Sequence, residues 1–212
     1  MPDPIATSAD YADAMIVARR AKNWLFLILL IMLLVQLAMF FIARYTTLII
    51  IGGGTTTQPV VSPWLDRLHY LSGVSTFLGT LLPPLLGAVL LLIVNIMLIG
   101  RLIGVARVTG AFVWCLLLVL MLFPWQAFLN NANFSAAEFK IPGVLYTWDE
   151  LVLSAKFQPA RIEERILKWA RFLVFPLIAL IVLMIVQVKS NRGLRQALGE
   201  ADPDLGEPEI NA

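Results

Sequence analysis

Cysteine and histidine are almost missing from this chain of 212 residues, which holds one of each. Because Cys115 is the only cysteine, an intrachain disulfide and a cysteine-rich metal site are both impossible. His69 alone cannot supply the several axial ligands that a dihaem membrane bundle needs. Neither residue has a catalytic partner in its own predicted helix. The sequence therefore predicts no catalytic residue, no metal site and no cofactor, and a protein that is not an enzyme.

Charged residues are also few in this chain. Charged residues make up 14% of the chain and hydrophobic residues 59%, with a mean hydropathy of +0.83. A soluble domain is roughly 45–50% apolar and about 25% charged, so lipid must cover part of this surface. The net charge of +2 is too small to indicate a nucleic-acid partner. The expected partners are the lipid bilayer and, in addition, other membrane subunits or a second copy of the chain.

Four runs of the sequence lack charged residues and are long enough to cross a hydrocarbon core of about 30 Å as helices. The second of them lies within a longer charge-free stretch, 68–100. The predicted fold is an all-α membrane protein, with a membrane domain over 9–199. Its four transmembrane helices are expected at about 23–43, 74–100, 108–129 and 171–189.

Two external loops, 44–73 and 130–170, separate these spans. The first holds Gly52-Gly53-Gly54 between two β-prone stretches, which predicts a short β-prone loop. The second holds a capping-box pattern at Thr147 to Glu150, which predicts a loop helix over about Trp148–Lys156. The ends, 1–8 and the acidic stretch 200–212, have the composition of disordered segments.

The sixteen Lys and Arg residues divide evenly between the two sides of such a bundle. The positive-inside rule gives most weight to short loops and to residues near helix ends. The tight connection Arg101–Arg107 and the cluster Arg19–Lys22 then place both termini in the cytoplasm, whereas the cluster Arg161–Arg171 argues for the opposite. The expectation is a multi-pass protein of the cell membrane with both termini cytoplasmic.

The middle of the second span carries the most unusual local sequence. Pro83 and Pro84 should release the carbonyls of Gly79 and Thr80 from their helical hydrogen bonds and kink the helix. Hydroxyls of Thr76 and Thr80, or ordered water, would then satisfy these carbonyls. Two interpretations stay open: a hinge or shallow polar site in the membrane, and a kinked helix whose small residues let a neighbour approach closely.

Two polar side chains within the spans, Gln36 and Asn95, are expected to form hydrogen bonds between helices. Two hypotheses of function remain. The first is a non-catalytic accessory, assembly or scaffold subunit of a membrane complex. The second is a small oligomeric transporter or channel that uses the Pro83–Pro84 break as a gate or polar site. Since charged residues inside a membrane usually mark a transport or proton pathway and the four runs contain none, the first hypothesis is favoured.

Overall fold

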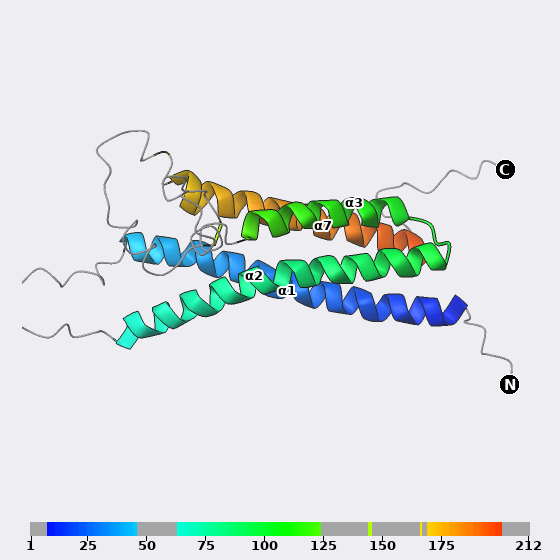
Figure 1. The fold of residues 1–212 in the computed structure, drawn as a ribbon, viewed down its shortest axis with the longest axis horizontal. Helices are drawn as coiled ribbons and strands as arrows, with labels where there is room; N and C mark the ends of the chain where they lie inside the picture. The colour runs from blue at the N-terminus through cyan, green and yellow to red at the C-terminus, as the bar shows by residue number, and fades with distance from the viewer. Residues whose placement is uncertain (1–7, 46–62, 124–143, 146–165, 167–168, 201–212) are drawn as a thin grey trace, which may run out of the picture. The chain divides into compact units, whose positions relative to one another are not determined.

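The computed structural model describes residues 8–45, 63–123, 144–145, 166 and 169–200. This part of the chain is all helical, with no strand. The order of elements is α1 (Ser8–Tyr45), α2 (Pro63–Ile99), α3 (Val105–Leu122), a short π-helix η3 (Ala170–Val174) and α7 (Phe175–Ala197) (Figure 1). The predicted β-prone loop and the predicted helix Trp148–Lys156 both lie outside the described residues.

Four helical stretches are long and apolar enough to cross a membrane: Tyr11–Ile42, Arg67–Ile99, Val105–Leu122 and Ala170–Ala197. The prediction of four membrane-spanning helices is confirmed at this level, and the arrangement is consistent with a multi-pass membrane protein. The first stretch has 32 residues, about 48 Å of helix at 1.5 Å per residue. Its basic residues before Asn23 therefore belong to the same helix as the apolar run.

The chain divides into two compact units, and α1, α2, α3 and α7 each contribute to both. Unit 1 holds Met1–Ile28, Pro84–Leu118 and Val182–Ala212, and unit 2 holds Leu29–Pro83 and Val119–Ile181. On α2 the boundary falls between Pro83 and Pro84, although α2 runs as one α-helix from Pro63 to Ile99. The helix therefore continues through both prolines, and the predicted release of the Gly79 and Thr80 carbonyls stays a prediction.

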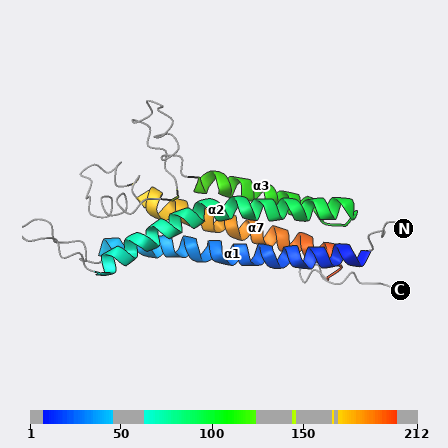
Figure 2. The ribbon, with the colours of Figure 1, turned by 60° about the horizontal axis from the view of Figure 1, so that its bottom comes forward.

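Within unit 1, a tight turn joins α2 to α3, and the two helices lie side by side (Figure 2). Leu102 N–H bonds Met97 O at 2.9 Å and Arg101 N–H bonds Leu98 O at 3.2 Å, which is a Schellman cap. The residue in the left-handed conformation is Arg101 (φ 50°), where glycine is the usual choice. Only residues 100–104 separate the end of α2 from the start of α3, and the cap uses the first of them.

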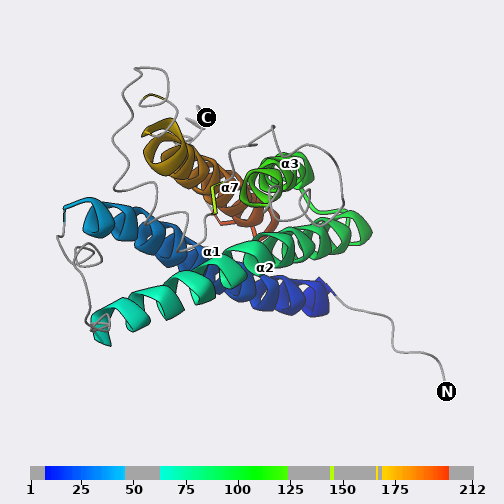
Figure 3. The ribbon, with the colours of Figure 1, turned by 60° about the vertical axis from the view of Figure 1, so that its left-hand side comes forward.

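The start of α3 and the end of α7 also lie side by side in unit 1 (Figure 3). They approach at two glycines. A Cβ at Gly193 would lie 2.6 Å from Val108 Cγ2 and 3.1 Å from Gly104 O, and a Cβ at Gly104 would lie 2.7 Å from Gly193 O. Gly104 has a φ of 95° as well. Glycine at both positions is what permits this backbone contact.

Unit 2 has an aromatic core. The Phe40 and Phe172 rings stack at 5.2 Å, and the Trp169 ring meets Phe40 edge-on at 5.9 Å. Two residues of the predicted external loop, Val144 and Leu145, are also buried there. Val144 N–H bonds Met121 O at 3.5 Å, and a Cβ at Gly79 would lie 2.8 Å from Leu145 Cδ2. The chain after α3 therefore packs back against α2 at its glycine.

Candidate functional site

The most developed polar arrangement among the described residues lies in unit 1, where α1 meets α7. Met15, Ala18 and Lys22 are buried at helical spacing on α1, with relative exposures of 0%, 6% and 0%. Lys22 therefore sits on the buried face of α1. A fully buried lysine is unusual because moving an ammonium out of water is costly unless acceptors surround it.

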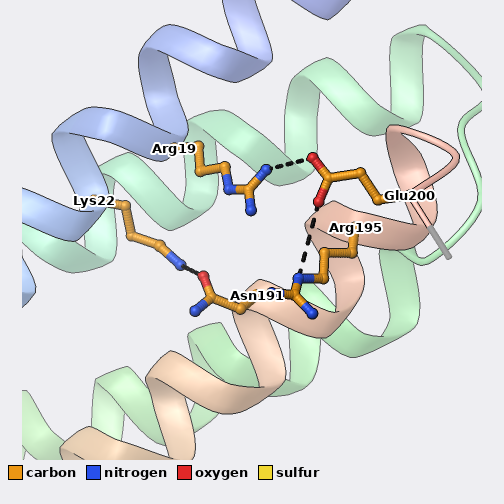
Figure 4. Close-up of polar contacts among 5 residues, drawn as sticks. All are labelled: Arg19, Lys22, Asn191, Arg195 and Glu200. Carbon is orange, nitrogen blue, oxygen red and sulfur yellow. Dashed lines mark hydrogen bonds and ion pairs between the residues drawn. The ribbon is translucent and has the colours of Figure 1, made fainter. Parts of the chain in front are cut away.

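Those acceptors come from α7. Lys22 Nζ donates to Ser190 Oγ at 2.9 Å and to Asn191 Oδ1 at 2.5 Å (Figure 4). Ser190 is itself fully buried, and its hydroxyl donates to Gln187 O at 3.1 Å. One turn along, Gln187 Nε2 donates to Asn23 Oδ1 at 3.1 Å. We call these five residues the α1–α7 polar cluster: Asn23, Lys22, Gln187, Ser190 and Asn191.

No carboxylate of the described residues forms an ion pair with Lys22. Ser190 Oγ and Asn191 Oδ1 are neutral oxygens, which accept hydrogen bonds without supplying an opposite charge. Because the Lys22 side chain is buried and its bonds go to the chain's own α7, this cluster joins two helices. Its chemistry is that of a structural tether.

A second contact extends this tether to the end of α7. Gly199 has a φ of 69°, and Glu200 N–H bonds Arg195 O at 2.9 Å, which caps the helix and turns the chain. The turn places the Glu200 carboxylate 2.8 Å from Arg19 Nη1 and 3.9 Å from Arg195 Nε (Figure 4). The hydrogen bond from Arg19, together with the charges of Arg19 and Arg195, lowers the pKa of Glu200.

Three residues of the predicted kink in α2, namely Thr76, Gly79 and Thr80, have local contacts in the structure. Thr80 Oγ1 donates to Thr76 O at 2.8 Å, and Thr76 Oγ1 donates to Ser72 O at 3.0 Å. These bonds go to the carbonyls of Ser72 and Thr76, and the way in which the carbonyls of Gly79 and Thr80 are satisfied stays a prediction. A threonine side chain in a helix points back towards the carbonyl four residues earlier, so each hydroxyl bonds a carbonyl one turn away. Gly79 is buried and provides the room for Leu145.

The two polar residues expected between helices lie in different surroundings. Gln36 is buried at 3% exposure on α1, whereas Asn95 is on the exposed face of α2. Hydrogen bonds of either residue to another helix stay a prediction. His69 is exposed, and Cys115 is buried beside Gly87, whose Cβ would lie 3.7 Å from its sulfur.

No group of three or more potential metal ligands occurs within the described ranges. Comparison of the chain with models of protein families, with curated proteins and with solved structures finds no match.

Sequence reasoning missed the polar cluster because Lys22 reads as an ordinary charge flanking a membrane span. One signal could have indicated its burial. Lys22 and Gln36 are fourteen residues apart, a spacing that puts both on one face of a helix. Two polar residues on one face of an apolar helix indicate the side that packs against other helices.

Proposed function

We propose that this chain is a non-catalytic integral membrane subunit that assembles or scaffolds a membrane complex. The observation that carries the proposal is the closed state of the α1–α7 polar cluster. Lys22 is fully buried and donates to Ser190 and Asn191 of the same chain. A transport pathway or an active site needs polar groups that a substrate can reach. Among the described residues, the fully buried Lys22 and Ser190 are committed to joining α1 and α7.

A braced bundle suits a scaffold role for a physical reason. Partners in a membrane associate through packing and interhelical hydrogen bonds, because lipid tails and apolar side chains are similarly apolar. Large apolar side chains are exposed on all four membrane helices, among them Ile31, Leu92, Val113 and Ile181. A helix held at a fixed angle by a tether presents such a face in one arrangement, which favours a specific partner.

We place the chain in the cell membrane with both termini cytoplasmic. The tight connection Arg101–Arg107 and the cluster Arg19–Lys22 support this orientation, because both belong to unit 1 together with the two terminal regions. In a Cys115→Ala background, Ser8→Cys and Tyr45→Cys put single thiols at opposite ends of α1. An impermeant maleimide applied to intact cells should label Tyr45→Cys and should label Ser8→Cys only after permeabilisation. The reverse pattern contradicts the orientation.

The alternative is a small oligomeric transporter or channel in which Pro83–Pro84 acts as a hinge. Its support is the pair of adjacent prolines within α2, which removes two backbone donors from the helix. The double variant Pro83→Ala/Pro84→Ala separates the two functions, with Pro176→Ala as a control for loss of a buried proline elsewhere.

In membranes that contain the native partners, the scaffold function predicts that the double variant still assembles. In vesicles of purified protein, it predicts that the wild type conducts neither protons nor potassium above the background of empty vesicles. Wild-type flux that the double variant loses and Pro176→Ala keeps would establish the alternative.

A further inference from the structure

The outer side of α2 carries an asparagine in an apolar setting. Within unit 1, the buried face of α2 is made of large apolar residues with exposures of 1% or less: Leu86, Leu90, Ile93 and Met97. Asn95 is two residues after Ile93, which is about 200° around an α-helix, and it is exposed. Its amide therefore lies on the side of α2 opposite to the buried face.

The charged turn after α2 sets the depth of Asn95 in the predicted membrane. Arg101 is six residues further along the chain, which corresponds to about 9 Å of helix. Asn95 thus lies inside the apolar run that ends before this arginine. Its neighbours on the outer side, Leu92 and Ile99, are exposed at 53% and 70%. In hydrocarbon an amide is costly without a hydrogen bond, so a polar partner on another helix stabilises it.

The outer side of α2 also has the spacing of a helix-packing seam. Exposed residues recur there at intervals of three and four, as do the core positions of a coiled coil, and membrane helices commonly pack in this geometry. A single asparagine among such positions specifies the register and the number of helices. We call these five residues of unit 1 the α2 outer seam: Leu85, Ala88, Leu92, Asn95 and Ile99.

We infer that the α2 outer seam is the interface with a second copy of this chain. Copies inserted with the same orientation hold Asn95 at the same depth. Two seams related by a two-fold axis along the membrane normal therefore bring the two amides together. A carboxamide has both N–H donors and an acceptor oxygen, so each Asn95 donates to the oxygen of the other. This self-complementarity favours a second copy over a different protein as the occupant of the seam.

The pairing goes beyond the proposed function and does not rest on it. A complex built with this chain would contain two copies of it, joined along α2. Exposed apolar side chains on the other helices, such as Val113 of α3, remain for contacts with other subunits. A test on the purified chain alone therefore separates the pairing from the scaffold function.

The test is energy transfer between copies of the purified full chain in phosphatidylcholine liposomes. Ser8→Cys in a Cys115→Ala background carries the donor or the acceptor dye, and the transfer is measured as the ratio of protein to lipid is lowered. The wild-type seam should give transfer well above that of randomly distributed chains. Asn95→Leu should raise the apparent dissociation constant of the dimer about tenfold, the effect of losing hydrogen bonds between membrane helices. Asn95→Gln, which keeps the amide, should preserve most of the pairing.

Thr109→Val is the matched control, because Thr109 is an exposed polar residue of the same unit on α3. It should leave the dissociation constant unchanged. Equal effects of Asn95→Leu and Thr109→Val would overturn the role of the amide. Wild-type transfer no greater than that of randomly distributed chains would overturn the interface and leave the seam to lipid or to another subunit.

Disulfide crosslinking tests the same seam without any change at Asn95. In the Cys115→Ala background, Leu92→Cys on the seam and Val113→Cys on α3 put single thiols at exposed positions of unit 1. Oxidation in native membranes should link two copies through Leu92→Cys and give little dimer through Val113→Cys. Equal crosslinking at the two positions, or none through Leu92→Cys, would contradict pairing along α2.

Discussion

Lys22 and Ser190 lie 168 positions apart in the sequence, and a hydrogen bond of 2.9 Å joins the ammonium of the first to the hydroxyl of the second. Both side chains are fully buried. This contact joins the first and last membrane helices of the chain within one compact unit. The free energy of unfolding should therefore change by different amounts when the lysine is removed and when its acceptors are removed.

Removal of the acceptors should be more harmful than removal of the lysine. Ser190→Ala with Asn191→Leu leaves the Lys22 ammonium buried without acceptors, which should lower the free energy of unfolding by about 1.5–3 kcal/mol for each bond to the charge. Lys22→Met removes the charge and fills its volume, so the expected loss is under about 1.5 kcal/mol. Adding Lys22→Met to the acceptor double variant should restore most of the stability. Unfolding in a detergent titration checks this order, and equal losses in all three variants would contradict it.

The pH dependence of the Glu200 contact has a defined sign. The folded pKa of this carboxyl is lowered by its hydrogen bond from Arg19 and by the neighbouring arginine charges. Its contribution to stability is therefore present above the unfolded value of about 4.3 and is lost as the pH falls through the lower folded value. The thermal midpoint of the wild type should exceed that of Glu200→Gln at pH 7, by a small amount because the contact is exposed. The difference should shrink as the pH falls below about 4, and a difference that grows there would refute the assignment.

Two glycines of α2 should respond oppositely to alanine. A Cβ at Gly73 meets nothing within 4 Å, so Gly73→Ala should stabilise the helix by about 0.5–1 kcal/mol. A Cβ at Gly79 would lie 2.8 Å from Leu145 Cδ2, so Gly79→Ala should cost about 1–3 kcal/mol through overpacking. Because the clash is with one side chain, a double-mutant cycle with Leu145→Ala should give a coupling of at least about 0.5 kcal/mol. A coupling of zero would mean that Leu145 does not pack there.

The α3–α7 seam should not tolerate a methyl group at Gly193. Its Cβ would lie 3.1 Å from Gly104 O and 3.2 Å from Val108 N, which are backbone atoms that no rotamer change can move. Gly193→Ala should cost about 1–3 kcal/mol or more. Gly110→Ala is the matched control on the same seam, because its nearest atom is the mobile Lys189 Nζ at 3.8 Å. Thermal unfolding in detergent compares the two, and equal midpoints would contradict the close backbone approach.

The number of membrane helices could be predicted because it depends on local sequence. A run of about 20 residues without charge has one low-cost conformation in lipid, which is a helix. Where each helix packs could not be predicted in the same way. Apart from Gln36, the run 24–43 is apolar on every side, so hydrophobic periodicity alone does not distinguish the face that contacts α7 from the face that contacts lipid.

The α1–α7 polar cluster could not be predicted from the sequence for a related reason. The link from Lys22 to Ser190 and Asn191, and that from Gly79 to Leu145, join residues far apart in the chain. A single sequence contains no periodicity that records such pairs. The threonines of α2 are the opposite case, because their contacts could have been predicted. Their hydroxyl contacts are local and follow from the backward tilt of helical side chains, so sequence reasoning could have placed them correctly.

The central claim, a subunit of a membrane complex, is tested most directly by native mass spectrometry of the tagged chain extracted gently from its own membrane. The account predicts one dominant assembly in which the chain, of 23.6 kDa, is bound to other membrane proteins in a fixed ratio. The acceptor double variant, in which the tether is lost, should give less of that assembly than Lys22→Met does. A lone monomer or a homo-oligomer without any other protein would contradict the account.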